Sequence, residues 1–181
     1  MGSIKVVLAD DHQIVRKGLK SLIEAEIDME VVGEAGTGRE AVELTEAENP
    51  DVVLMDISMP RLNGFEATRR IIEFNPDVKV LMLTVHDDED YIYRSLEAGA
   101  SGYLIKETAP ERLIEAIHTV KGEGAYLGSS ITAKVVRKFR EDTEGEDGIE
   151  DFDQLTGREK EILQLIAEGN STKEIADLLY I

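Results

Sequence analysis

Five short apolar runs, evenly spaced along the first part of the chain, constrain its fold more than any other feature. They start 25, 23, 26 and 24 residues apart and are rich in valine, isoleucine and leucine. Between them lie stretches with apolar residues at helical spacing, such as Val15, Leu19 and Leu22. Apolar strands that alternate with amphipathic helices predict a parallel sheet covered on both faces. The expected strands are 4–9, 29–32, 52–55, 78–83 and 102–105.

The expected fold class is therefore α/β, a doubly wound, flavodoxin-like, five-stranded parallel sheet that occupies residues 1–122. A linker over residues 123–153 follows. It begins with a short helix and ends in an acidic tether, residues 141–153, with eight acidic and no basic side chains. The basic residues of the short helix, which we expect to face solvent, are Lys134, Arg137, Lys138 and Arg140.

Residues 154–181 differ from the rest of the chain in their pattern. Thr156 with Glu159, and Ser171 with Glu174, form two capping boxes, and each precedes a short apolar face. This predicts two short helices joined by a tight turn, which is an incomplete all-α domain.

Composition excludes several classes of protein. The absence of cysteine excludes disulfide frameworks, thiolate catalysis and cysteine-bound zinc. No apolar run approaches the roughly 18 residues that a membrane-spanning helix needs. The first residues do not form a basic region followed by an apolar one, so we do not expect secretion. A net charge of −18 argues against non-specific affinity for nucleic acid. We therefore expect a cytoplasmic protein without a membrane partner.

Polar side chains follow four of the predicted strands where each strand ends. These are Asp10 and Asp11, Asp56, Thr84 and Lys106. In an open parallel sheet the carboxyl ends of strands form the ligand site, so we expect these side chains to converge. Three converging carboxylates need a hard cation, which predicts Mg²⁺, while a lysine and a hydroxyl suit a phosphoryl group. Asp56 can then serve as metal ligand and as nucleophile toward phosphorus.

These residues also carry a family resemblance. The segments Asp10-Asp11, Met55-Asp56-Ile57-Ser58-Met59-Pro60 with Gly64, Leu83-Thr84 and Tyr103-Leu104-Ile105-Lys106 resemble the receiver domain of two-component response regulators, over about residues 3–122. The segment from Leu155 to Ala176 resembles the start of the NarL/FixJ helix-turn-helix domain, which is of the LuxR type.

The resemblance implies a phosphorylation site with a metal. Asp56 would accept a phosphoryl group from a sensor histidine kinase. Asp11 and Asp56 would bind Mg²⁺ directly, Asp10 would help through water, and the main-chain carbonyl of Ser58 would complete the protein ligands. No other cofactor is implied.

The resemblance also implies a switch. Thr84 would be the switch hydroxyl, Lys106 would contact the phosphoryl group as part of the catalytic set with Asp56, and the Tyr103 ring would change rotamer with Thr84. Ser58 and His86, two residues beyond Asp56 and Thr84, would tune the lifetime of the phosphoryl group.

The leading hypothesis is a phosphorylation-controlled transcription factor, which is a switch and not an enzyme that turns over a substrate. One alternative is a Mg²⁺-dependent phosphotransferase or phosphatase, although Ser58 stands where such enzymes usually carry a second acid. Another is a protein-interaction switch without DNA-binding output. The resemblance places the recognition helix after Ile181, so we expect DNA to be bound by the full-length parent and not by this truncated chain.

We also expect a phosphorylation-dependent homodimer that forms through the first and the last of the five receiver helices, or through the last two. The last receiver helix carries Leu113, Ile117 and Val120, more apolar residues than one sheet face obviously requires.

Simpler interpretations of single residues stay open at this point. Asp10 and Asp11 could cap the first helix, and Tyr103 could be a half-buried strand aromatic whose hydroxyl faces water. His12 and His86 are expected to be polar residues at the mouth of the crevice.

Overall fold

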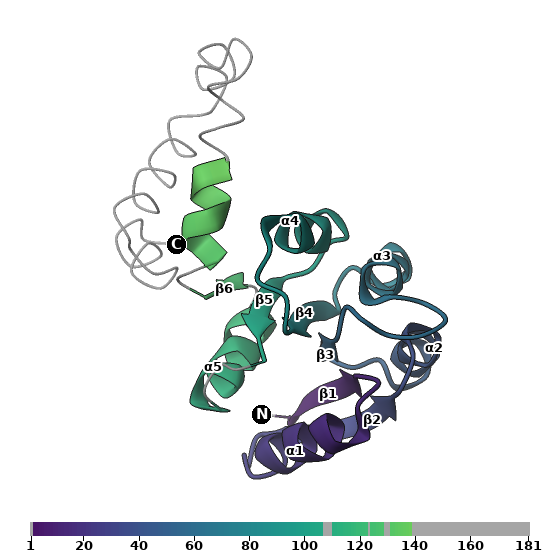
Figure 1. Ribbon diagram of the computed structural model, residues 1–181. Coiled ribbons are helices and arrows are strands. Elements are labelled where there is room, and N and C mark those ends of the chain that lie inside the picture. Colours follow the sequence, from purple (N-terminus) through teal and green to yellow (C-terminus); the bar gives the residue numbers. More distant parts are fainter. Residues whose placement is uncertain (1, 107–109, 123, 129–130, 139–181) are drawn as a thin grey trace. The chain divides into compact units, whose positions relative to one another are not determined.

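The structure is a computed structural model that describes residues 2–106, 110–122, 124–128 and 131–138. Strands and helices alternate along the chain, as Figure 1 shows. The elements are β1 (Ile4–Ala9), α1 (Gln13–Ile23), β2 (Met29–Ala35), α2 (Gly38–Glu48), β3 (Val52–Met55), α3 (Gly64–Phe74), β4 (Lys79–Thr84), α4 (Glu89–Glu97), β5 (Gly102–Ile105), α5 (Pro110–Lys121) and β6 (Tyr126–Leu127). None of the helices described is long and apolar enough to cross a membrane.

The chain divides into two units, Met1–Gly128 and Ser129–Ile181. In the second unit residues 131–138 are helical, as predicted for the short basic segment. The predicted acidic tether and the two predicted C-terminal helices lie outside the described residues.

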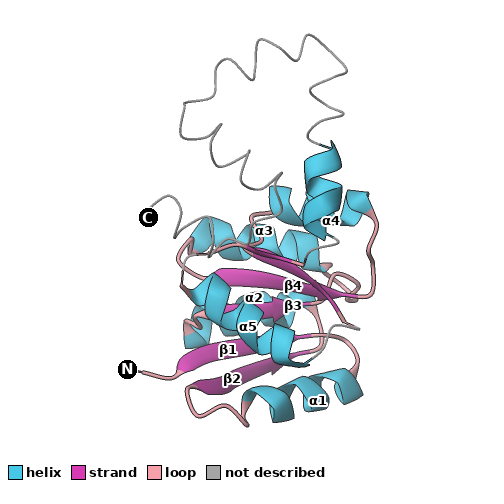
Figure 2. Cartoon of the chain, turned by 90° about the vertical axis from the view of Figure 1, so that its left-hand side faces the viewer, coloured by secondary structure: helices cyan, strands magenta, loops and turns pink. Residues whose placement is uncertain are grey.

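The first unit is one parallel sheet with helices on both faces. Its strand order is β2-β1-β3-β4-β5-β6, and every neighbouring pair is parallel. Helices α1 and α5 cover one face, and α2, α3 and α4 cover the other (Figures 1 and 2). Strand β3 is buried along its whole length and β1 and β4 nearly so, which agrees with their unbroken apolar sequence. The predicted flavodoxin-like fold is confirmed.

The apolar residues of α5 belong to the core. Leu113 is 3% exposed, and Ile117 and Val120 are fully buried against the face of the sheet that α1 also covers. These three side chains were the sequence argument for a dimer surface on this helix. That argument is wrong, because the strands β1, β3 and β4 present enough apolar surface to bury all three.

The sheet has one more strand than the five expected. Residues Tyr126 and Leu127 form β6, which pairs with Gly102 and Tyr103 of β5. A side chain at Gly102 would place its Cβ 2.8 Å from the Tyr126 carbonyl oxygen and 2.7 Å from Leu81, so glycine allows this close approach. A strand of two residues has no apolar run, which is why sequence periodicity does not predict it.

The register of the strands brings their polar ends together. Ala9 of β1 is paired with Met55 of β3, so the residues that follow them, Asp10 and Asp56, lie side by side. Thr84 is paired with Ile105 in the same way, which places Lys106 just beyond Thr84. All of these side chains therefore leave the sheet at one edge.

Gly64 closes the loop that follows β3. Its N–H donates to the Ile57 carbonyl at 2.9 Å, and the preceding Asn63 caps α3 by accepting a hydrogen bond from Glu66 N–H. A Cβ at Gly64 would lie only 2.2 Å from the Asp56 carbonyl oxygen. The loop can therefore pack against Asp56 only if this residue is glycine.

We predict that Gly64→Ala destabilises the protein by about 2 kcal/mol or more, because the backbone at Asp56 must shift to accept the methyl group. The matched control is Gly18→Ala in α1, where an added Cβ meets nothing within 4 Å. It should be stabilising by about 0.5–1 kcal/mol, the difference in helix propensity. Thermal unfolding of both variants provides the measurement, and a Gly64→Ala protein as stable as the wild type would contradict this packing.

Candidate functional site

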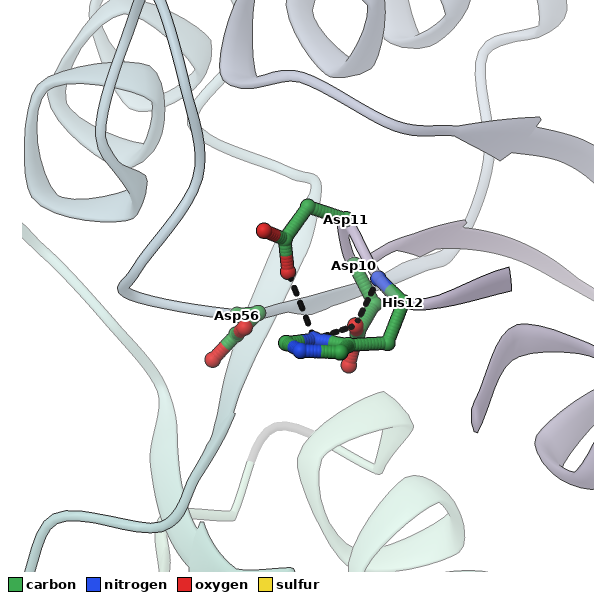
Figure 3. A group of neighbouring side chains, drawn as sticks. All are labelled: Asp10, Asp11, His12 and Asp56. Carbon is green, nitrogen blue, oxygen red and sulfur yellow. Dashed lines mark hydrogen bonds and ion pairs between the residues drawn. The ribbon is translucent and has the colours of Figure 1, made fainter. Parts of the chain in front are cut away.

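Three carboxylates meet at the carboxyl edge of the sheet. Asp10 and Asp56 are 2% and 4% exposed, whereas Asp11 faces solvent. One ligand atom from each of them, together with one from His12, lies within 4.8 Å of all the others. Figure 3 shows the three carboxylates and the imidazole gathered around one small space. The sequence prediction that these acids converge is therefore supported by their geometry.

Lys106 supplies the positive charge inside this cluster. Its ammonium nitrogen lies 2.6 Å from Asp10 Oδ2 and 3.0 Å from Asp56 Oδ2, and its side chain is only 15% exposed. Burial alone would lower the pKa of this ammonium, but the ion pairs with Asp10 and Asp56 outweigh burial and raise that pKa above its ordinary value. Lys106 is therefore charged at neutral pH and joins two buried carboxylates.

The donor set fits a hard divalent cation. Asp10 Oδ2 is buried, and although Lys106 lies close to it, it accepts no well-aligned hydrogen bond from any described residue. Carboxylate oxygens from Asp10, Asp11 and Asp56 are the ligands that Mg²⁺ prefers, and one lysine cannot neutralise three of them. These acids could therefore hold Mg²⁺.

His12 belongs to the same cluster. Its ring Nδ1 lies 2.7 Å from Asp11 Oδ1 and 3.3 Å from Asp10 Oδ1. Its main-chain N–H donates to Asp10 Oδ1 at 2.8 Å. His12 is also the N-cap residue of α1, so both acids precede the helix and its cap. The imidazole is 69% exposed, which agrees with the prediction of a polar residue at the mouth of the crevice.

Thr84 and Tyr103 meet at the main chain of one residue, His86. Thr84 is fully buried, and its Oγ1 accepts a hydrogen bond from His86 N–H at 3.2 Å. Tyr103 is also fully buried, and its hydroxyl donates to the His86 carbonyl at 2.8 Å. Burial raises the pKa of this phenol well above its ordinary value, as do the charges of Asp87 and Asp88. The alternative that the Tyr103 hydroxyl faces water is wrong for this structure.

The side chain of His86 contacts the loop after Asp56. Its Nε2 is hydrogen-bonded to Ser58 Oγ at 3.2 Å, and its ring stacks on Tyr91. The family resemblance implied a shared role of Ser58 and His86 in the lifetime of the phosphoryl group, but their contact was not predicted. The sequence carries no signal for Tyr91, because a stack between a loop residue and a helix residue follows no periodic pattern.

The chain matches two known families. Residues 6–118 match the response regulator receiver domain, and residues 153–181 match the bacterial regulatory proteins of the luxR family. The transcriptional regulatory protein DegU of Brevibacillus brevis is 44% identical over 98% of this chain and 80% of its own length. The oxygen regulatory protein NreC of Staphylococcus carnosus (strain TM300) is 42% identical over 98% of this chain and 83% of its own.

Solved structures show the same relationship. A two-component response regulator of the LuxR family from Aurantimonas sp. SI85-9A1 superposes with a TM-score of 0.72 at 34% identity, over 76% of this chain and 98% of that one. The response regulator ChrA of a heme-sensing two-component system superposes with a TM-score of 0.64 at 32% identity, over 100% of this chain and 83% of that one. The predicted resemblances to a receiver and to a LuxR-type domain are confirmed.

The ion pairs of Lys106 lead to a prediction about Mg²⁺. In Lys106→Gln the carboxylates of Asp10 and Asp56 lose their shared cation, so without Mg²⁺ the variant should lose about 3 kcal/mol of stability. Added Mg²⁺ should replace that charge, and the rise in Tm on adding Mg²⁺ should be larger in the variant than in the wild type.

The matched control is Lys121→Gln, which removes the ion pair with Asp51 at the opposite edge of the sheet. Its Mg²⁺-dependent rise in Tm should equal that of the wild type. Equal rises in the two lysine variants would show that Lys106 does not share the metal's site.

Proposed function

Because this chain belongs to the response regulators that join a receiver domain to a LuxR-family DNA-binding domain, we propose that it is a phosphorylation-controlled transcription factor with Asp56 as phosphoacceptor. The observation that carries this proposal is the placement of the Asp56 carboxylate. It is buried, lies beside Asp10 and Asp11, and has the Lys106 ammonium 3.0 Å from one oxygen. In that setting the Lys106 ammonium can stabilise the negative charge of a phosphoryl group attached to Asp56.

The reaction is a transfer between two proteins. An oxygen of Asp56 attacks the phosphorus of a phosphohistidine on a sensor histidine kinase, forming an acyl phosphate. The bond between phosphorus and the histidine nitrogen breaks, and the imidazole leaves with the electron pair and takes up a proton. Lys106 can turn from the carboxylate oxygen to a phosphoryl oxygen, because its ammonium already lies between Asp10 and Asp56.

Mg²⁺ bound by Asp10, Asp11, Asp56 and the Ser58 carbonyl would offset the charge on the phosphoryl oxygens when it is present. The acids keep the roles given to them by the resemblance, with Asp11 and Asp56 as direct ligands and Asp10 acting through water. Burial divides the acids differently, since Asp56 and Asp10 are enclosed while Asp11 lines the opening.

Thr84 and Tyr103 are the proposed switch. The Thr84 hydroxyl already accepts the His86 N–H, so its own hydrogen is free to turn toward a phosphoryl oxygen. Tyr103 is bonded to the carbonyl of the same residue, so a displacement of the loop at His86 changes the environment of both side chains. Tyr103 belongs to β5, so the response reaches the face formed by α4, β5 and α5.

A switch is better supported than an enzyme with repeated turnover. The residue two positions after Asp56 is Ser58, whose hydroxyl is bonded to His86, so no second carboxylate stands at that position. The relatives that the chain matches are transcription regulators. We propose that the protein is phosphorylated as a switch, and that it does not turn over a substrate repeatedly as a phosphatase or a phosphotransferase does.

The proposed domains are a receiver over residues 1–122, a linker over 123–153 and the LuxR-type part over 154–181. Strand β6 comes from the proposed linker and adds to the receiver sheet. The proposed partners are the sensor kinase, DNA bound through the LuxR-family domain, and a second copy of the chain. The proposed location is the cytoplasm.

We predict that Mg²⁺ and a small phosphodonor such as acetyl phosphate add one phosphoryl group to the wild type and none to Asp56→Asn. Intact mass measures the adduct. The matched control is Asp77→Asn, which changes an exposed acid between α3 and β4 and should be phosphorylated as the wild type is. An adduct that persists in Asp56→Asn, or that forms equally with Mg²⁺ chelated, would contradict the proposal.

We also predict that phosphorylation strengthens self-association. Leu113, Ile117 and Val120 of α5 are buried and cannot form this surface, whereas α1 offers Ile14 at 87% and Leu22 at 37% exposure. Sedimentation of the phosphorylated wild type should show more dimer than Asp56→Asn treated in the same way. One monomer mass for both at high concentration would refute the homodimer.

A further inference from the structure

A row of stacked side chains runs from the edge of the site to the helices α3 and α4. The His86 ring lies on the Tyr91 ring with centroids 4.2 Å apart and planes 11° from parallel. Tyr91 in turn packs at a tilt against Phe65, with centroids 5.9 Å apart. The Arg94 guanidinium covers the Phe65 ring at 4.5 Å. The row therefore connects the β4–α4 loop to both helices.

His86 is held at both ends of its main-chain unit. Its N–H donates to Thr84 Oγ1 and its carbonyl accepts from the Tyr103 hydroxyl. These hydrogen bonds fix the main-chain position of His86 but not the direction of its imidazole. Its direction is set by two contacts, the hydrogen bond with Ser58 and the stack on Tyr91.

The hydrogen bond between Ser58 and His86 joins the two loops that rim the phosphoacceptor. Ser58 is exposed and lies two residues after Asp56, which is 4% exposed. On the other rim Val85, the neighbour of His86, is 58% exposed. A phosphoryl group on Asp56 must extend outward from the buried carboxylate, so its outer face lies toward the opening that this bond spans.

We propose that Tyr91 is a positioning residue that prolongs the lifetime of the phosphoryl group on Asp56, because its ring holds His86 against Ser58. The inference rests on the proposed function, since it concerns the loss of that group. In hydrolysis a water oxygen bonds to phosphorus, the bond from phosphorus to the Asp56 oxygen breaks, and the carboxylate leaves with the electron pair. The proton of the water goes to solvent. A closed bridge between the two rims hinders the approach of that water.

The size of the effect follows from the stack. Aromatic pairs contribute enough to change an equilibrium by about threefold to tenfold, so loss of the Tyr91 ring should open the bridge to about that extent. Tyr91→Leu should therefore shorten the lifetime of the phosphoryl group about threefold to tenfold. Tyr91→Phe keeps the ring, removes only the hydroxyl, and should keep the wild-type lifetime.

The experiment uses protein that has been phosphorylated with acetyl phosphate and Mg²⁺ and then freed of the donor. Loss of the adduct is followed by intact mass over time in the wild type and the variants. Phe65→Leu is the matched control, because it removes the next ring of the row but leaves the stack of His86 on Tyr91. Its lifetime should stay within twofold of the wild type, and thermal unfolding should confirm that each variant is folded.

A double-variant cycle separates positioning from a general loss of structure. His86→Ala should shorten the lifetime, and adding Tyr91→Leu to it should have no further effect, because the residue through which Tyr91 acts is already absent. Effects of the two substitutions that multiply would overturn the inference, as would an unchanged lifetime in Tyr91→Leu. A lifetime in Tyr91→Phe as short as in Tyr91→Leu would overturn it too, since the hydroxyl and not the stack would then matter.

These outcomes differ from a failure of the proposed function. If the wild type takes up no phosphoryl group, or if Asp56→Asn takes one up equally, both proposals are refuted. If the adduct forms on Asp56 and its lifetime does not depend on Tyr91, only the positioning role is refuted.

Discussion

The ion pairs that join Lys106 to Asp10 and Asp56 are the interaction on which the rest of the site depends. Two nearly buried carboxylates this close together would repel each other strongly, and the lysine between them offsets that cost. The lysine can offset this repulsion only if all three groups lie close together, and the register of the strands places them there. Asp10, Asp56 and Lys106 each follow directly after a buried strand, so the core of the sheet fixes their positions.

The same arrangement leaves the charge of the site incompletely balanced. The lysine neutralises the site only in part, because Asp11 adds a third carboxylate at the opening. A metal and a phosphoryl group would change this balance of charge, and we propose that the loop that contains His86 responds to it. This one residue contacts Thr84, Tyr103 and Ser58 by hydrogen bonds and Tyr91 by stacking, so it connects β4, β5, α4 and the loop after β3.

Much of this could be predicted from the sequence because the determining patterns are local. Each apolar run became a strand, with shifts of one residue at β4 and an extension of β2 to Ala35. The convergence of the acids and Lys106 followed from one rule, that parallel strands end at the same edge. That Asp56 can bind a metal and attack phosphorus was predicted from its place among these residues, and its proposed role as phosphoacceptor for a histidine kinase was implied by family resemblance.

What the sequence did not predict depends on contacts between distant residues. Strand β6 forms because Gly102 lets a short segment approach β5, and two residues leave no periodic signal. The stack of His86 on Tyr91 depends on how the β4–α4 loop meets the helix. The three apolar residues of α5 were wrongly predicted to form a dimer surface, because the sequence of one helix does not show how much apolar surface the sheet offers for its burial.

The most direct test of the central claim is a high-resolution crystal structure of the protein with Mg²⁺ and beryllium trifluoride, which mimics a phosphoryl group. The account predicts the fluoride adduct on Asp56, Mg²⁺ beside Asp11 and Asp56, and the Lys106 ammonium turned toward a fluorine atom. An adduct on another residue, or a Lys106 side chain that points away from the adduct, would contradict it.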